Sequence, residues 1–154
     1  MLEISSIKNG IVIDHIEQGQ GYQIFKFLKL HRSDYTAALI MNVKSSKTGR
    51  KDLIKISNNL DIDLGILGLF SDKITVNYIE NEEVAGKVRV ILPEYVQGIL
   101  ICGNPRCISN HERNMETSFR LNNRSSHDYI CDYCDHHFDV KEINKWSSSK
   151  IENW

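Results

Sequence analysis

The sequence of 154 residues lacks any apolar run long enough to cross a membrane as a helix, and it opens on no basic segment followed by a hydrophobic one. We therefore expect no membrane association and no secretory signal. It also lacks an excess of either charge, with 19 Lys and Arg against 20 Asp and Glu. Nucleic-acid-binding proteins usually carry a clear basic excess, so we expect no nucleic-acid partner.

Signatures of catalysis are missing as well. The chain has no Gly-x-Ser-x-Gly elbow, no Walker-type phosphate loop and no His-Glu-x-x-His motif. Asp14-His15 is the one adjacent acid and base that suggests chemistry, but neighbouring side chains on a strand point to opposite faces. We predict a non-catalytic protein.

Cysteine is scarce, yet its spacing is informative. Cys102 and Cys107 form a C-x4-C pair, and Cys131 and Cys134 form a C-x2-C pair. Two short pairs separated by a loop are typical of a structural zinc site, which fills all four positions with protein and leaves none for catalysis. A disulfide pair or four inert buried thiols are the competing interpretations. Cysteines kept reduced at a metal indicate a cytoplasmic protein.

Four histidines lie near these cysteines in sequence and could each replace one as a ligand: His111, His127, His136 and His137. Because four thiolates complete a tetrahedral site, we expect these histidines to lie on the surface.

The first 93 residues predict a ferredoxin-like α+β sandwich, an antiparallel sheet with two helices on one face. Asn9-Gly10 predicts a hairpin turn between apolar runs at Leu2–Ile7 and Ile11–Ile16. Helices are expected at Tyr22–Leu30 and Asp61–Phe70. Further strands are expected at Tyr35–Val43, Lys51–Ile56, Ile74–Ile79 and Val84–Leu92.

Strand alternation places Lys51, Leu53 and Lys55 on one face, opposite Asp52, Ile54 and Ile56. With Lys87 on another strand, these lysines could bind phosphate, and Asp14 could accept hydrogen bonds from ribose hydroxyls. The alternative is that the lysines form only the solvated face of a sheet.

The remainder predicts a short hinge at Glu94–Gln97 and a small β-rich zinc domain at residues 98–146, with strands at Thr117–Leu121 and His127–Ile130. Such a domain has too little core to be stable without its metal. A polar tail follows at residues 147–154.

Several segments together resemble the regulatory chain of aspartate carbamoyltransferase. They are Val12-Ile13-Asp14-His15-Ile16, Gly49-Arg50-Lys51-Asp52-Leu53-Ile54-Lys55-Ile56, Thr75-Val76-Asn77, Val84-Ala85-Gly86-Lys87 and the frame of four cysteines. The resemblance extends in order from about residue 2 to residue 146. It departs at Glu82, Gly103 and Asp132, where relatives carry tyrosine, proline and lysine.

This resemblance implies a non-catalytic allosteric subunit in de novo pyrimidine biosynthesis. Its family binds CTP as inhibitor and ATP as activator, with UTP reinforcing inhibition in some members. A zinc domain contacts the catalytic chain, and three regulatory dimers join two catalytic trimers in a dodecamer. The implied nucleotide-binding residues are Ile4, Ser6, Ile7, Val12, Asp14, His15, Lys51, Leu53, Lys55, Asn77, Val84 and Lys87.

Two other functions are compatible with the patterns. A nucleic-acid-binding zinc ribbon would need basic residues at its metal site, whereas Asp132, Asp135, Asp139 and Glu142 surround the second cysteine pair. A free-standing nucleotide sensor would share the lysine-bearing face but would have no enzyme partner.

Overall fold

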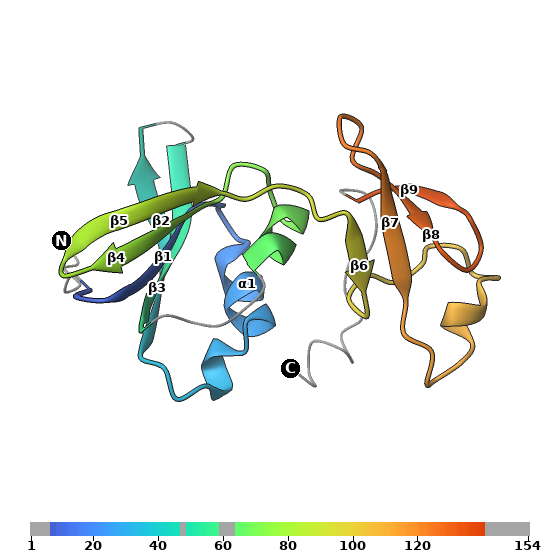
Figure 1. Cartoon of the computed structure of the whole chain (residues 1–154), viewed down its shortest axis with the longest axis horizontal. Coiled ribbons are helices and arrows are strands. Elements are labelled where there is room, and N and C mark those ends of the chain that lie inside the picture. Colours follow the sequence, from blue (N-terminus) through green and yellow to red (C-terminus); the bar gives the residue numbers. More distant parts are fainter. Residues whose placement is uncertain (1–6, 47–48, 59–63, 141–154) are drawn as a thin grey trace.

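The computed structural model describes residues 7–46, 49–58 and 64–140, which form two domains side by side (Figure 1). The first domain is a five-stranded sheet with helices against one face, and the second is built on a four-stranded sheet. The two-domain α+β organisation expected from the sequence is confirmed.

Every strand pair in the first sheet is antiparallel, and the strand order is β2-β3-β1-β4-β5. The strands are β1 (Gly10–Glu17), β2 (Ala37–Ser45), β3 (Gly49–Ser57), β4 (Thr75–Glu80) and β5 (Glu83–Arg89). Helical segments connect β1 to β2 and β3 to β4. This is the expected ferredoxin-like topology with one additional edge strand.

One face of this sheet is covered by α1 (Gly21–Phe27), η1 (Leu30–Arg32) and η2 (Leu64–Leu69), as Figure 1 shows. The core between sheet and helices contains Ile11, Ile13, Ile54, Ile56 and Val76 from the strands and Ile24, Leu28, Leu67 and Phe70 from the helical side. Alternation sends the intervening side chains to the opposite face. We call that uncovered side the open face.

The helical predictions were only partly right. α1 ends at Phe27, before the predicted end at Leu30, and Lys29 takes the left-handed conformation with φ 58°. Tyr22, expected on the apolar stripe, is 54% exposed and has the Lys26 ammonium 5.3 Å above its ring.

The second helix was predicted at Asp61–Phe70. Within the described residues this segment forms a 3₁₀ helix, η2, and the predicted start lies in residues 59–63, which are outside the described residues. A Cβ on Gly68 would overlap the carbonyl of Ile91, so this turn lies directly on the segment after β5. The predicted strand at Leu2–Ile7 also falls outside the described residues, apart from Ile7.

The second sheet has the order β6-β7-β8-β9. Its strands are β6 (Tyr95–Gln97), β7 (Ser118–Asn123), β8 (Asp128–Cys131) and β9 (His137–Asp139), with η3 (Ile108–Asn110) between β6 and β7. β6 pairs with β7, so the segment predicted as a hinge is part of this sheet. β9, which pairs with β8, was not predicted.

The two domains share buried contacts through η2. Leu67 is buried in the core of the first domain, whereas Leu69 is buried in the core of the second with Leu92 and Val96. The Tyr129 hydroxyl also donates to the Pro93 carbonyl at 2.6 Å. A short helix and the connecting segment therefore join both cores.

Among the described residues, no helix has the length and apolarity needed to span a membrane.

Candidate metal centre and open-face site

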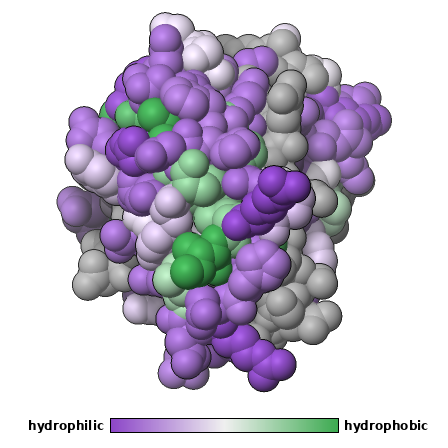
Figure 2. Space-filling model, turned by 90° about the vertical axis from the view of Figure 1, so that its right-hand side faces the viewer, coloured by the Kyte–Doolittle hydropathy of each residue, from purple (hydrophilic) through white to green (hydrophobic). Residues whose placement is uncertain are grey.

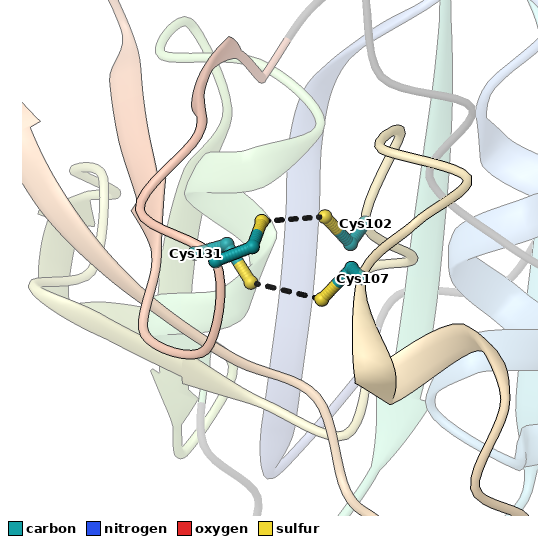
Figure 3. Close-up of side chains that lie close together, drawn as sticks. Cys102, Cys107 and Cys131 are labelled. Carbon is teal, nitrogen blue, oxygen red and sulfur yellow. Dashed lines mark hydrogen bonds between the residues drawn. The ribbon is translucent and has the colours of Figure 1, made fainter.

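Four cysteine side chains converge at one point of the second domain. Cys102 and Cys107 come from the loop between β6 and η3, Cys131 ends β8, and Cys134 lies in the turn before β9. Their sulfurs all lie within 4.8 Å of one another. Figure 3 shows Cys102 and Cys107 of the loop facing Cys131 at the end of β8.

The sulfur spacing fits one tetrahedral ion. The Sγ atoms are 3.6 Å apart between Cys102 and Cys134 and 3.7 Å apart between Cys107 and Cys131 (Figure 3). A tetrahedron with metal–sulfur bonds of about 2.3 Å requires sulfurs about 3.8 Å apart. A disulfide would require about 2.05 Å. The four thiols are therefore free, and the disulfide interpretation is wrong.

Asparagines shape the loop that carries the first two cysteines. Asn104 Oδ1 accepts from the Arg106 backbone N–H at 3.1 Å, which closes the turn between the cysteines. Asn110 Nδ2 donates to the carbonyls of Cys102 and Asn104 at 2.9 and 2.8 Å. These contacts hold the loop in position for both sulfurs. No pattern in the sequence indicates this role of Asn110.

The four nearby histidines do not join the sulfur cluster. His111 lies 2.9 Å from the Pro105 carbonyl, and His137 pairs with Asp128 at 2.8 Å. His136 stacks on Phe138, and His127 has its backbone in the left-handed region with φ 57°. Among the described residues, the group of side chains close enough to hold one metal ion consists of the four cysteines.

The thiols differ in acidity. Burial raises the pKa of the Cys102 and Cys131 thiols above the ordinary value. Burial acts in the same direction on Cys134, but hydrogen bonds from the Asn104 side chain and the His136 backbone N–H outweigh it and lower the pKa to about 6. Because metals bind thiolates, a metal bound by these cysteines would displace protons from the buried thiols.

Exposed apolar side chains lie directly beside the metal ligands. Ile108, next to Cys107, is 50% exposed, and Tyr133, between the last two cysteines, is 44% exposed. Together with Met115, Glu112 and Glu116 they line a groove of about 490 Å³. Figure 2 shows hydrophobic surface among polar groups at the end of the molecule formed by this domain.

The acidic residues around the second cysteine pair are not all free. Asp132 accepts hydrogen bonds from the Ser118 hydroxyl at 2.5 Å and from the Arg120 guanidinium at 2.6 Å, and these lower the pKa of its carboxyl. Arg120 also reaches Asp135 at 3.5 Å. The turn between Cys131 and Cys134 is thereby tied to β7.

On the first domain, strand pairing brings separate predicted residues into one line across the open face. Lys87 of β5 lies opposite Asn77 of β4, Asn77 opposite Val12 of β1, and Val12 opposite Lys55 of β3. The side-chain oxygen of Asn77 is buried and has no hydrogen-bond partner in the described structure. We call these four residues the cross-strand row.

An ion pair lies beside this row. The Asp14 carboxylate and the Lys51 ammonium are 2.8 Å apart, and both side chains are largely buried. His15 has φ 59°, its N–H donates to Asp14 at 2.7 Å, and its Nδ1 lies 3.0 Å from the Thr75 hydroxyl. A left-handed histidine is uncommon and costs backbone energy, so the surrounding contacts hold it there.

The other predicted nucleotide-binding residues lie around this group. Leu53 is on β3 between the two lysines, and Ile7 lies three residues before the start of β1. Val84 pairs with Ile79, which in turn pairs with Gly10, two residues from Val12 along β1. Ile4 and Ser6 lie outside the described residues.

A separate cleft of about 740 Å³ lies where β1 ends. It is lined by charges of both signs, including Glu17 and Asp72 with Arg50 and Lys73, and it shares only His15 with the predicted nucleotide-binding residues. The acidic side chains of this cleft would repel a polyphosphate. The open face, with its three lysines, suits such a ligand better. The open face is therefore the better candidate site.

Family models match the chain in two parts. Residues 2–91 match the aspartate carbamoyltransferase regulatory chain, allosteric domain, and residues 94–144 match the metal binding domain of the same chain. The second match makes the four-cysteine domain a metal-binding domain.

Curated relatives agree along almost the full length. An aspartate carbamoyltransferase regulatory chain of Clostridium botulinum is 47% identical over 145 residues, covering 94% of this chain and 99% of the relative. One from Clostridium tetani is 48% identical over 143 residues, covering 92% and 99%. One from Bifidobacterium longum is 38% identical over 134 residues, covering 87% and 96%. The chain belongs to the family of aspartate carbamoyltransferase regulatory chains, and it is accordingly a regulatory, non-catalytic subunit.

Proposed function

We propose that the open face of the first domain binds CTP as an inhibitor and ATP as an activator, and that the second domain transmits the effect to the catalytic chain of aspartate carbamoyltransferase. UTP would share this site. The observation that carries the proposal is the cross-strand row with its adjacent ion pair. Residues from four strands, far apart in sequence, form one charged surface there.

Each group on this surface has a role that suits a nucleoside triphosphate. Lys51, Lys55 and Lys87 supply ammonium groups, which bind phosphate as point charges. The Asp14 carboxylate can accept hydrogen bonds from ribose hydroxyls. Asn77 offers a buried oxygen that can accept one more hydrogen bond from a ligand. Around them, Ile7, Val12, Leu53 and Val84 offer apolar contact for a base, and His15 would line the same base pocket.

The metal of the second domain is proposed to be zinc, held by Cys102, Cys107, Cys131 and Cys134. Four thiolates at this spacing suit zinc and leave no open coordination position, so the ion would supply folding free energy and no reaction chemistry. Ile108 and Tyr133, next to these ligands, would be positioned by the metal. We propose that they contact the catalytic chain.

We further propose a regulatory homodimer, three copies of which join two catalytic trimers in a cytoplasmic dodecamer. Within the described residues, β2 and β5 are the edges of the first sheet. β5 exposes Val84 and Val88 among charged residues and carries Lys87 of the proposed nucleotide site, whereas β2 exposes Met41 at 47% and carries none of the proposed site residues. An exposed edge of nine residues is a template for pairing with another strand, and pairing through β2 would leave Lys87 free for the nucleotide, which favours β2 for the second copy.

Nucleotide affinity tests the site directly. Lys55→Ala and Lys87→Ala should each weaken both CTP and ATP by about tenfold to a hundredfold, because each removes one phosphate-binding charge and costs roughly 1.5–3 kcal/mol. Isothermal titration calorimetry on the full chain measures both ligands. Both variants should keep the unfolding temperature of the unmodified chain, since neither lysine is in the core.

Lys26→Ala is the matched control, because it removes the same charge from α1 on the covered side of the sheet. It should leave both affinities within about twofold of the unmodified chain. Unchanged affinity in the Lys55 and Lys87 variants, or an equal loss in the control, would contradict the assignment of the site.

A further inference from the structure

Asp52 is a fully buried carboxylate in the middle of β3, between Lys51 and Leu53. It accepts three backbone hydrogen bonds. Oδ2 accepts from Gly19 N at 3.1 Å and from Gly21 N at 3.0 Å, and Oδ1 accepts from Asn42 N at 3.0 Å. A buried charge persists only when such partners satisfy it. Asp52 therefore ties β3 to the loop after β1 and to β2.

Both neighbours of β3 are irregular at this point. On one side Ile13 pairs with Ile54 and Ile16 with Asp52, so Asp14 and His15 together face one residue of β3. On the other side Ile40 pairs with Leu53 and Val43 with Lys51, so Met41 and Asn42 face only Asp52. These are two β-bulges, and each contains a left-handed residue, His15 with φ 59° and Asn42 with φ 62°.

A bulge redirects the side chains of the strand that contains it. Asp14 lies in the first bulge, and its carboxylate reaches the Lys51 ammonium of β3 at 2.8 Å. Asp52 holds the backbone of both segments that flank β3 next to Lys51. It binds Asn42 in the second bulge, on β2, and it binds Gly19 and Gly21, which follow the first bulge after the end of β1. Its carboxylate thus fixes the segments that orient Asp14 and Lys51.

We propose that Asp52 is a positioning residue for the nucleotide site, which sets the direction of the Asp14–Lys51 pair without contacting the ligand. This inference rests on the proposed nucleotide binding by the open face. The two acceptor oxygens of the Asp52 carboxylate are the essential feature, because all three partners are N–H donors and an amide nitrogen in place of one oxygen cannot accept from any of them.

Asp52→Asn tests this with nearly unchanged volume. Calorimetry on the full chain should show about a tenfold loss of affinity for both CTP and ATP. Ile54→Val is the control, because it alters the buried face of the same strand without touching either bulge, and it should leave both affinities unchanged.

A double-mutant cycle separates positioning from general destabilisation. In a chain that already carries Asp14→Ala and Lys51→Ala, Asp52→Asn should weaken CTP less than twofold further, since the groups that it positions are gone. A tenfold loss that persists in this background overturns the proposal, and so does unchanged affinity of Asp52→Asn alone.

If Asp52→Asn does not fold, the exposed bulge residue provides the same test. Asn42→Val places a β-branched residue at a left-handed position and should weaken CTP binding, whereas Asn42→Gly accepts that conformation and should not. Equal affinity of these two variants overturns the proposal. Absence of CTP and ATP binding by the unmodified chain would instead refute the nucleotide site itself, so the two failures are distinguishable.

Discussion

Asp14 combines a structural contact with a proposed nucleotide contact in one side chain. Its burial raises the pKa of the carboxyl, but the hydrogen bond from Lys51 and the backbone N–H of His15 outweigh this and lower the pKa below its ordinary value. A carboxyl with a lower pKa in the folded state favours folding when it is ionised. The ion pair therefore contributes to stability as well as to the proposed ribose contact.

This contribution has a defined pH range. It is fully present above the unfolded pKa of about 3.9 and is lost as the pH falls through the lower folded pKa. We predict that Asp14→Asn reduces the free energy of unfolding near pH 7 and that the difference from the unmodified chain shrinks below about pH 4. Denaturant titrations across this range measure it. A difference that stays constant with pH would show that the charge of Asp14 is not the cause.

Single residues differ in how far the sequence predicts them. Alternation along β3 is a local property, so the sequence places Lys51 and Lys55 on one face and Asp52 on the other, as the structure has them. The partners of Asp52 come from Gly19, Gly21 and Asn42, which no local pattern connects to it. The left-handed backbone of His15 likewise depends on the pairing of β1 with β3.

At the scale of elements, the loop from Cys102 to Cys107 and the end of β8 meet at the four cysteines, where the proposed metal would hold them together. The second domain has a small core, and a structural zinc ion contributes roughly 10–16 kcal/mol in zinc-binding peptides, which is as large as the whole stability of a typical domain. The metal should therefore decide whether this domain is folded.

We predict that Cys107→Ala unfolds the second domain, makes it sensitive to proteolysis and abolishes association with the catalytic chain, while most CTP affinity remains in the first domain. Ser109→Ala is the control, because it removes only a hydroxyl 3.0 Å from the Cys107 sulfur and keeps all four ligands. Metal analysis, limited proteolysis and gel filtration report the outcome. A Cys107 variant that still associates with catalytic trimers would show that the metal does not shape the contact surface.

Elements are predictable where their patterns are local. The strands of the first sheet are found from their apolar alternation, whereas β6 and β9 have three residues each and become strands only by pairing with β7 and β8. The presence of glycine at position 103 is likewise explained only by the three-dimensional structure. A Cβ there would lie 3.0 Å from the Phe138 ring, so a small residue fits against β9.

At the scale of the whole molecule, η2 is the element that both domains share. Leu67 packs in the first core and Leu69 in the second, two residues apart on one short helix. An effector can regulate only by favouring one of two arrangements, so an element buried in both domains is suited to couple them.

Leu69→Ala and Leu67→Ala form a matched pair for this coupling. Each should lower the free energy of unfolding by about 2–5 kcal/mol. We predict that Leu69→Ala keeps nucleotide affinity but reduces the nucleotide response of the assembled enzyme, whereas Leu67→Ala weakens nucleotide affinity itself. Calorimetry and activity assays on the same preparations measure both effects. Identical behaviour of the two variants would contradict a coupling role for η2.

The regulatory function is tested most directly by reconstitution. Carbamoyl aspartate formation by the cognate catalytic trimer should be measured alone and with this chain, each with and without CTP and ATP. The chain by itself should be inactive, should shift the trimer to a larger particle, and should make its rate fall with CTP and rise with ATP. A chain that neither associates with the trimer nor confers a nucleotide response would contradict the proposed function.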